Sequence, residues 1–322
     1  MKDKLKIIFM GTPEFAGIIL EKLIASETYK PSLVITRPDK PLGRKQILTP
    51  PPVKQRILNL ESGIKNKIKV LQPERLKDPE IITKIKEEEP DIIIVAAYGK
   101  IIPKEIIDIP RFGVLNVHAS LLPLYRGASP ISAAILNGDH ETGATIMLID
   151  EELDHGPILS QARVSITPED TTESLGQKMA DAGVDLLLDT IQKWIDGAIK
   201  PQPQDHSRAT HTKILIKQDG EIKAEYTAEH IERMARAYFP WPGIHLNYEL
   251  RIRNQKSEKK RLKIIKTKII RCEKQLPPLS FSLTSKKELC LHATNGCLIL
   301  ETVQPEGKKP MSGYDFYLGN RA

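Results

Sequence analysis

The chain has 322 residues, of which 40% are apolar and 28% charged, the composition of a soluble globular protein with room for about two domains. No apolar run approaches the roughly 20 residues of a membrane span, and the run Leu5–Met10 contains Lys6, so we expect a cytoplasmic protein without membrane attachment or secretion signal. Cys272, Cys290 and Cys297 lack C-x-x-C spacing, which argues against a disulfide framework or a zinc site.

The positive charge is concentrated towards the C-terminus. Residues 1–200 carry 26 basic and 28 acidic side chains, whereas residues 201–322 carry 22 basic and 13 acidic side chains. Within residues 251–271, ten basic residues accompany a single acidic residue. This asymmetry indicates a polyanionic partner such as a nucleic acid, although a solvated basic face would have the same composition.

In the first two-thirds of the chain, short apolar runs alternate with amphipathic stretches. The runs predict strands at 6–11, 32–36, 68–71, 91–99, 114–118, 144–149 and 158–164. Helices are predicted after Thr12-Pro13, where Thr12 is a possible cap, near 78–88, after Ser129-Pro130 and over 171–194. The strand at 91–99 is apolar on both faces, as in a parallel sheet covered on both sides. Residues 1–196 are therefore predicted to form a Rossmann-like, doubly wound, mostly parallel α/β domain.

The pattern changes after this domain. Residues 197–211, rich in Pro, Gln and Ser, predict an interdomain linker. A short helical stretch near 227–237 then precedes alternating runs, at 244–252, 261–270, 289–293 and 297–302. Residues 212–322 are therefore predicted to form a small, OB-like β-barrel domain. Its basic run alternates with apolar residues in places, which fits a strand with its basic side outward.

Ligands of an open parallel sheet bind outside the carboxyl ends of its strands. After the first strand, Gly11-Thr12-Pro13 lacks the glycine spacing of a dinucleotide site, and no P-loop motif occurs, which disfavours a nicotinamide dehydrogenase or a P-loop enzyme. Asn116 and His118 end a later strand and project from one face, because side chains alternate along a strand. Asp154 follows the next strand, so its carboxyl group is expected at the same edge.

This set of residues offers hydrogen-bond donors and an acid–base pair, but no recognisable serine or cysteine nucleophile and no metal-binding histidine spacing. It suits a reaction in which the substrate supplies the nucleophile and the enzyme stabilises a developing oxyanion. A structural role for His118 is the simpler alternative. Thr145 either orients the pair or is an ordinary strand residue, and Arg126 is interpreted as an anchor of the loop before it.

Two segments resemble the folate-dependent formyltransferases: NVHASLLPLYRGASP, from Asn116, and ETGATIMLIDEELDHGPIL, from Glu141. In that family an Asn, a His and an Asp form the catalytic set, which implies catalytic roles for Asn116, His118 and Asp154. The opening IIFMGTPEFA, the segment TRPDKPLGRKQILTPPPVK and the late FPWPG and EGKKPMSGYDF resemble family members that act on aminoacyl-tRNA. The resemblance covers nearly the whole chain.

The resemblance implies 10-formyltetrahydrofolate as donor, without a metal, and the α-amino group of methionine on initiator tRNA as acceptor. It also implies a role in translation initiation. The sequence does not indicate the oligomeric state, and we expect a monomer. The residues implied to border the folate are Ser120, Leu121, Leu122, Pro123, Tyr98, Gly99 and Asp150. His118 donates best when protonated, a state that Asp154 would favour, and Asp154 could also accept the surplus proton of the amine.

Contacts with tRNA are implied in two places. Arg44 and Lys45 lie in an inserted segment, residues 36–54, which is expected to be a loop of irregular backbone near the active site, or else a disordered surface insertion. Lys259, Lys260 and Arg261 lie in the basic run of the C-terminal domain.

Two other functions were weighed against this one. Formyl transfer to a small amine, such as an amino sugar nucleotide, would use the same three residues but leave the basic domain and the inserted segment without a purpose. A non-catalytic RNA-binding protein on an inherited enzyme fold is less consistent with the presence of Asn116, His118 and Asp154.

Overall fold

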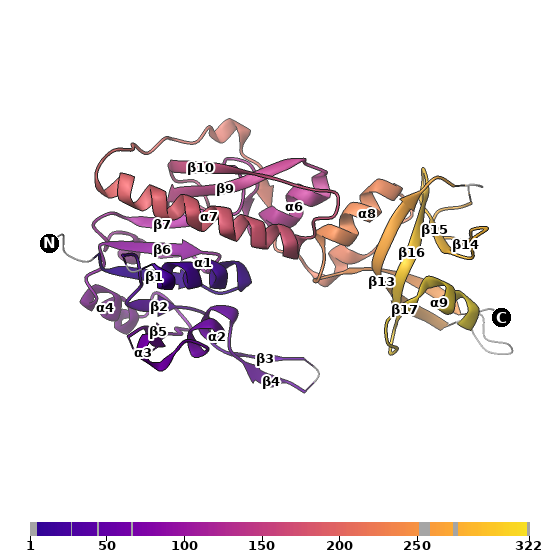
Figure 1. The fold of residues 1–322 in the computed structure, drawn as a ribbon, viewed down its shortest axis with the longest axis horizontal. Coiled ribbons are helices and arrows are strands. Elements are labelled where there is room, and N and C mark those ends of the chain that lie inside the picture. Colours follow the sequence, from indigo (N-terminus) through magenta and orange to yellow (C-terminus); the bar gives the residue numbers. More distant parts are fainter. Residues whose placement is uncertain are drawn as a thin grey trace. The chain divides into compact units, whose positions relative to one another are not determined.

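The computed structural model describes residues 5–26, 28–43, 45–65, 67–250, 258–272 and 276–320. They form two compact units (Figure 1), of which unit 1 comprises Met1–Pro130, His140–Ile166 and Leu175–Lys213. Unit 2 comprises Ile131–Asp139, Thr167–Ser174 and Ile214–Ala322. The predicted fold class is confirmed: a mostly parallel α/β domain precedes a small antiparallel β domain. None of the helices described has the length and apolar character needed to cross a membrane.

Unit 1 is built on a seven-stranded sheet with the order β10-β9-β7-β6-β1-β2-β5. The five strands from β7 to β5 are parallel, and β9 and β10 are antiparallel to their neighbours. All seven strands match predicted runs. Their bounds are β1 Ile7–Gly11, β2 Leu33–Ile35, β5 Lys69–Leu71, β6 Ile92–Ala96, β7 Val114–His118, β9 Glu141–Leu148 and β10 Ile158–Ser165.

The strands carry apolar side chains on both faces of the sheet, so helices cover both faces. Ile7 and Phe9 pack in the cluster that contains α1, α2 and α7, whereas Ile8 and Met10 pack with α4 and α5. Each such buried side chain stabilises the fold by about 1.5–3 kcal/mol. The helix bounds are α1 Glu14–Ala25, α2 Pro52–Leu58, α3 Ser62–Lys65, α4 Pro79–Glu87, α5 Lys104–Ile107 and α7 Thr172–Ile195.

The strand order reverses beside β1, where the chain returns from β5 to β6 on the other side of β1. Thr12 was considered a possible cap of the helix that follows, but it does not cap that helix. Helix α1 begins at Glu14, with Pro13 in the cap position, and no side chain caps it. The Thr12 hydroxyl instead donates to the carbonyl oxygen of Tyr98 at 3.1 Å. It therefore ties the carboxyl ends of β1 and β6 together at the switch point, where ligands of such sheets bind.

The inserted segment contains regular structure, contrary to the expectation of an irregular loop. β3 (Lys40–Leu42) and β4 (Ile47–Thr49) form an antiparallel hairpin. At its base, Lys54 Nζ contacts Asp39 Oδ2 at 2.8 Å and Gln72 Oε1 at 2.7 Å. Hydrogen bonds from Lys54 and Gln72 lower the pKa of the Asp39 carboxyl group. The prolines and the glycine of this segment favour a loop, so the sequence pattern did not predict these two strands of three residues each.

Unit 2 contains an antiparallel sheet with the order β12-β13-β16-β15-β14, and β17 pairs with β16. Among the residues described, β12 and β14 do not pair with each other, so the predicted barrel is an open, incomplete one. The Thr227 hydroxyl caps α8 by accepting from the His230 amide at 3.1 Å. The bounds are β12 Ile244–Leu250, β13 Glu258–Ile270, β14 Phe281–Leu283, β15 Leu289–His292, β16 Cys297–Pro305, β17 Met311–Ser312, α6 Pro130–Asn137, α8 Ala228–Ala237 and α9 Gly313–Gly319.

A disulfide joins Cys272 to Cys297, which overturns the expectation that the cysteines form none. Ile270, the last residue of β13, pairs with Cys297 at the start of β16. Cys272 follows two residues later, with its Cα atom 5.4 Å from that of Cys297, a usual separation for a disulfide. Strand register brings the two together, and a sequence separation of 25 residues gives no sign of it.

Gly143 of β9 leaves no room for a methyl group. A Cβ atom there would lie 2.1 Å from the carbonyl oxygen of Ala162 on β10 and 2.5 Å from Leu121 Cδ2. The carbonyl belongs to the neighbouring strand, so it moves only if the ladder opens. We expect Gly143→Ala to lower the free energy of unfolding by about 1–3 kcal/mol or more, measured by urea denaturation.

Gly63 of α3 supplies the matched control. No atom lies within 4 Å of a Cβ placed there, and Gly63 does not have a positive φ. Gly63→Ala should leave the free energy of unfolding unchanged or raise it by up to about 1 kcal/mol. Equal losses in the two variants would contradict the close approach at Gly143.

Candidate active site

Asn116 and His118 lie on β7, between β6 and β9. Both side chains project from the same face of the sheet, and they are only 9% and 5% exposed. The backbone of His118 pairs with Thr145 of β9. A buried amide and a buried imidazole need hydrogen-bond partners, and these come from loops on either side of β7.

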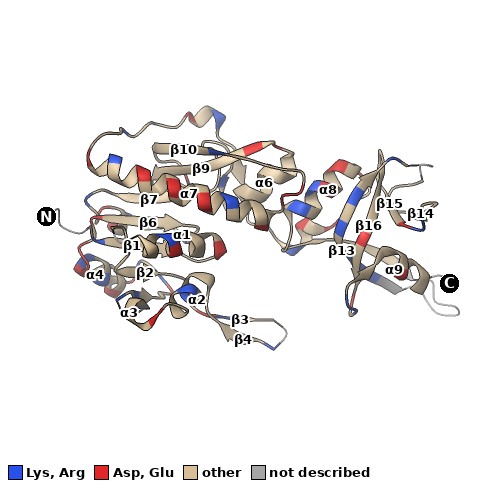
Figure 2. Cartoon of the chain, viewed as in Figure 1, with Lys and Arg blue, Asp and Glu red and all other residues tan. Residues whose placement is uncertain are grey.

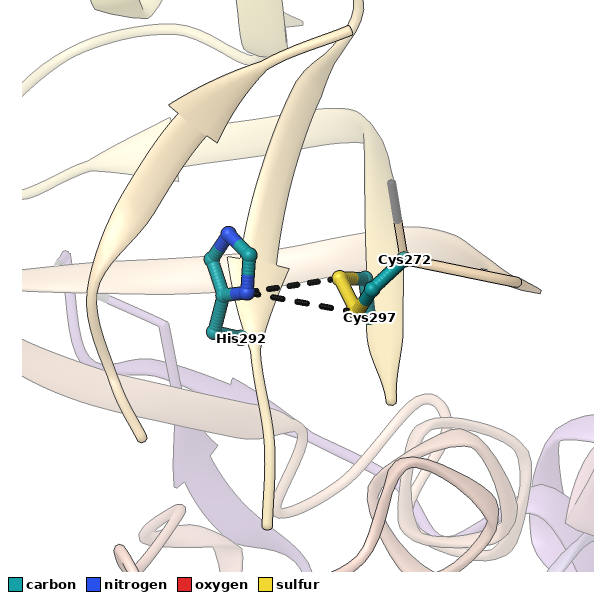
Figure 3. Close-up of side chains that lie close together, drawn as sticks. All are labelled: Cys272, His292 and Cys297. Carbon is teal, nitrogen blue, oxygen red and sulfur yellow. Dashed lines mark hydrogen bonds between the residues drawn. A yellow bond between two sulfur atoms is a disulfide. The ribbon is translucent and has the colours of Figure 1, made fainter. Parts of the chain in front are cut away.

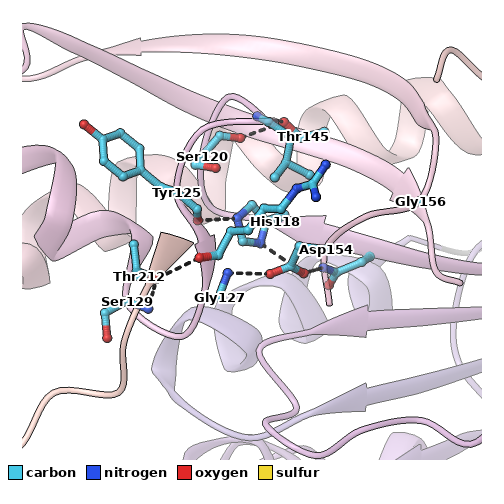
Figure 4. A network of polar contacts seen from close by, with 12 residues as sticks. His118, Ser120, Tyr125, Gly127, Ser129, Thr145, Asp154, Gly156 and Thr212 are labelled. Carbon is cyan, nitrogen blue, oxygen red and sulfur yellow. Dashed lines mark hydrogen bonds and ion pairs between the residues drawn. The ribbon is translucent and has the colours of Figure 1, made fainter. Parts of the chain in front are cut away.

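Asp154 comes from the turn after β9, where its backbone adopts a left-handed conformation (φ 50°). Its Oδ2 atom accepts from the Gly127 amide at 2.7 Å. Its Oδ1 atom lies 3.4 Å from Asn116 Nδ2 and 3.6 Å from His118 Nδ1. Figure 4 shows the contacts of the carboxylate with Gly127 and His118. The structure thus brings together the three residues that the sequence singled out, although they are up to 38 residues apart in the chain.

The two nitrogens of the His118 ring have different environments. Nε2 lies 3.1 Å from the carbonyl oxygen of Tyr125, which can only accept a hydrogen bond, so Nε2 carries the proton of the neutral ring. Nδ1 faces the carboxylate of Asp154. A proton gained or lost by this imidazole is therefore held at Nδ1.

Thr145 organises the loop that follows β7. Its hydroxyl donates to the Ser120 carbonyl at 2.6 Å and accepts from the Leu122 amide at 3.2 Å. Gln161 Nε2 contacts the Leu122 carbonyl and the Thr145 hydroxyl, both at 2.9 Å. Thr145 was considered as a residue that orients Asn116 and His118. In the structure it orients the loop after β7. Ser120 and Leu122 are buried, whereas Leu121 and Pro123 are half-buried.

Residues 197–211 were predicted as a linker, but the structure packs part of this segment against the site loops. Gln204 is 6% exposed. Its Oε1 atom accepts from Arg126 Nη2 at 2.7 Å, and its Nε2 atom donates to the carbonyls of Asp154 and Gly156 at 2.9 and 2.7 Å. Gln204 therefore fixes the turn that carries Asp154, and Arg126 anchors the loop as interpreted from sequence. Hydrogen bonds, rather than apolar contacts, hold this segment against the site loops. Its polar composition therefore looks like that of a linker.

The same segment also supports the His118 loop. β11 (His211–Thr212) pairs in parallel with β8 (Arg126–Gly127). The Thr210 hydroxyl accepts from the Tyr125 amide at 2.8 Å, next to the carbonyl that holds His118. No motif pointed to Thr210, because its role arises only from this pairing.

Asp150 lies on the same loop as Asp154 but has its own partner. Its Oδ2 atom is 2.7 Å from His155 Nδ1, and the His155 ring stacks on His206 with centroids 4.1 Å apart. His206 Nδ1 in turn lies 2.8 Å from Arg126 Nη2. These two histidines were not predicted. They link the Asp150 turn to the segment 197–211.

Tyr98 and Gly99 follow β6, but the Tyr98 side chain points into the core. Burial raises its pKa to about 12. Tyr98 Oη, Thr36 Oγ1 and Arg37 Nε are buried and meet no hydrogen-bond partner among the residues described. Arg37 Nη2 donates to the Gly99 carbonyl. Polar atoms without partners therefore gather at the ends of β2 and β6, beside the switch point.

The predicted tRNA contacts are more dispersed. Arg44 lies outside the described residues, as does the side chain of Lys259, whereas Lys45 is exposed in the β3–β4 turn. Lys260 and Arg261 are half-buried on β13. Figure 2 shows Lys and Arg positions, in blue, along that strand. The exposed ones on β13 or directly after it are Lys266, Lys268 and Arg271.

Comparison with known proteins agrees with this architecture. Residues 4–191 match a family described as formyl transferase, and residues 214–321 match its C-terminal domain. A solved N-formyltransferase from Helicobacter canadensis, in complex with folinic acid and dTDP-3-aminofucose, superimposes with a TM-score of 0.61 at 20% identity, over 92% of this chain and 98% of that chain. That level of identity bears on the fold alone. The chain belongs to the formyl transferase family.

Curated relatives are more similar. The methionyl-tRNA formyltransferase of Roseiflexus castenholzii is 42% identical over 98% of this chain and 96% of that protein. The methionyl-tRNA formyltransferase of Roseiflexus sp. is 44% identical over 98% of this chain and 93% of that protein. The similarity therefore extends through both units.

Thr145 offers a test of how the loop after β7 is held. Thr145→Val removes a hydroxyl that serves the Ser120 carbonyl, the Leu122 amide and Gln161. Leaving the Leu122 amide without this partner should cost about 1–3 kcal/mol. We expect a corresponding fall in the free energy of unfolding, measured by urea denaturation, and a loss of formyl transfer.

Thr142, on the same strand, is the control for Thr145. It is also buried, at 3% exposed, but its hydroxyl meets no hydrogen-bond partner among the residues described. Thr142→Val should be neutral or stabilising, because it removes an unsatisfied polar atom. A Thr142 variant that loses as much stability as the Thr145 variant would argue against the hydrogen-bond explanation.

Proposed function

We propose that this chain transfers the formyl group of 10-formyltetrahydrofolate to the α-amino group of methionine esterified to initiator tRNA. The observation that carries the proposal is the contact of the Asp154 carboxylate with Asn116 and His118. It occurs in a chain that is 42–44% identical, over nearly its full length, to proteins named for this reaction. Transfer to an amino sugar nucleotide is not favoured, because the similarity to those relatives includes the basic second unit.

The carboxyl edge of the sheet has groups that fit a polar, flat donor such as a folate. Thr36 and Arg37, which follow β2, each have a buried polar atom without a partner among the residues described. Leu121 and Pro123 present half-buried apolar surface on the loop after β7. We assign the donor to this edge, with the backbone of Tyr98-Gly99 and the turn at Asp150 beside it.

The acceptor needs little activation. An α-amino group has a pKa of about 7.7–8.0 in model compounds, so an appreciable fraction is free base at neutral pH. Attack on the formyl carbon places negative charge on the formyl oxygen. Asn116 Nδ2 directs one N–H at Asp154, and its other N–H meets no acceptor among the residues described. That N–H is our proposed donor to the developing oxyanion.

His118 and Asp154 form the acid–base pair for the reaction. Overall, the amine loses one proton and the folate nitrogen gains one when its bond to the formyl carbon breaks. Because Nε2 is committed to the Tyr125 carbonyl, Nδ1 is the His118 atom that exchanges a proton. The carboxylate of Asp154 stabilises positive charge at Nδ1 and is itself placed to accept the proton of the amine.

Binding of tRNA is assigned to the β3–β4 hairpin and the β13 face. The hairpin exposes Leu42, Ile47 and Leu48 to between 61% and 65%, and Lys45 is exposed in its turn. Exposed aliphatic side chains can wedge between base steps, and lysine supplies phosphate contacts. On β13, Lys268 and the adjacent Arg271 are exposed. We therefore propose Lys268 and Arg271 as the principal tRNA contacts of unit 2, rather than Lys260 and Arg261, which are half-buried.

The catalytic roles predict a specific kinetic pattern. Asn116→Ala, His118→Ala and Asp154→Ala should each lower kcat by at least about tenfold, and loss of an oxyanion donor typically costs about 10²–10³. Affinity for methionyl-tRNA should stay largely unchanged. Formylated product is measured with 10-formyltetrahydrofolate and methionyl-tRNA, and in parallel with an amino sugar nucleotide. Near wild-type turnover by the His118 variant would refute its role, and product only from the sugar nucleotide would refute the acceptor.

Binding should weaken with salt in proportion to the phosphate contacts made. Lys268→Gln and Arg271→Gln should each reduce the slope of log affinity against log salt by about 1, without changing kcat at saturating tRNA. Lys193→Gln on α7 is the control, because Lys193 is exposed and paired with Asp189 at 2.6 Å. If all three variants have the same slope, these two residues do not contact phosphate.

A further inference from the structure

Three metal-ligating side chains of unit 2 converge at one end of its sheet. Cys272 follows β13, Cys297 begins β16, and His292 ends β15, where it pairs with Cys297. His292 Nδ1 lies 3.3 Å from Cys297 Sγ and 4.0 Å from Cys272 Sγ. The ligand atoms all lie within 4.8 Å of one another. Figure 3 shows the imidazole edge directed at both sulfurs.

Hydrogen bonds to both ring nitrogens fix the orientation of the His292 ring. The Leu276 amide donates to Nδ1 at 3.3 Å, so Nδ1 has its lone pair available and the ring proton lies on Nε2. Nε2 is 2.8 Å from the Ser282 hydroxyl, which can accept that proton in a hydrogen bond. A metal-binding histidine is typically held in this way, with one nitrogen at the metal and the other donating to a neighbouring group.

The cluster is buried but has a route to solvent. His292 and Cys297 are each 2% exposed, whereas Cys272 is half-buried. Cys272 also lines a hollow of about 480 Å³ between α8, the end of β13 and the Asn295-Gly296 turn. An ion can therefore reach the sulfur of Cys272 without unfolding the sheet.

We propose that Cys272, Cys297 and His292 form a zinc site when the disulfide is reduced. Two thiolates and an imidazole are a ligand set that zinc prefers over magnesium or calcium. Paired cysteines are kept as thiols in reducing compartments, where the disulfide form would not persist. Three protein ligands would leave one position of a tetrahedral zinc ion for water. Spacing along the chain does not reveal this site, because strand register assembles it.

The two states of the site are chemically distinct. A phosphine reductant and water convert the disulfide to two thiols, and the phosphine leaves as its oxide. Zinc then replaces the two thiol protons, which pass to solvent, and takes the Nδ1 lone pair in place of the Leu276 amide. Only the reduced form has thiolates to offer, so metal binding and the disulfide exclude each other. In either state the end of β13 stays attached to β15 and β16.

Cobalt(II) is the probe for this site, because thiolate ligands give it a near-ultraviolet charge-transfer absorption. We expect the reduced full-length protein to bind one cobalt ion per chain with this absorption, which zinc should abolish by displacement. The oxidised protein, which has the same sequence and fold, should show no such absorption. Zinc should also raise the melting temperature of the reduced protein only. Absence of the absorption from the reduced protein would overturn the proposal.

Variants identify the ligands. Cys272→Ser and Cys297→Ser should abolish the absorption, and His292→Ala should weaken cobalt binding by about 10–100-fold or more. Cys290→Ala is the matched control, since Cys290 is as buried as Cys297 but lies outside the disulfide. Circular dichroism establishes that each variant is folded. A site that survives in Cys272→Ser, or that is lost in Cys290→Ala, refutes the assignment. These readouts do not depend on formyl transfer.

Discussion

The arrangement of the candidate site depends on one carboxylate that joins three separate segments. Asp154 accepts a backbone hydrogen bond from Gly127, in the loop after β7, and faces Asn116 and His118 on β7 itself. A buried carboxylate is costly unless it is paired or hydrogen-bonded, so these segments are held where they satisfy it. The geometry of the candidate site and the local stability of these segments therefore have the same cause at this position.

A second layer of residues holds the first in place. Thr145 and Gln161 position the turn that contains Leu122, and Gln204 fixes the backbone on both sides of the Asp154 turn. Thr210 holds the Tyr125 amide, next to the carbonyl that orients His118. Most of these contacts join side chains to backbone groups. They constrain loops outside the regular strands and helices, which the core alone would leave mobile.

Local physical rules predicted the first layer but not the second. Alternation along a strand placed Asn116 and His118 on one face. The carboxyl-edge rule for parallel strands led us to expect Asp154 beside them, but β9 is antiparallel to β7 and ends beside the start of β7, so the turn after β9 has to extend along β7 to reach His118. Gln204 was missed because a polar segment resembles a linker whether or not it is buried. The β3–β4 hairpin was hidden by its prolines. The proximity of Cys272 to His292 depends on strand register, which no spacing in the sequence encodes.

The pairing of β11 with β8 has a consequence for the modular history of this architecture. Residues up to Lys213 cluster with the α/β unit, and Thr212 closes on the backbone of Gly127. A chain cut after α7, where the sheet and its helices are already complete, would keep the three polar groups of β7 and the Asp154 turn while losing the strap around them. A different C-terminal domain would therefore have to be joined after Thr212 for residues 197–212 to keep their contacts with the loops around Asp154.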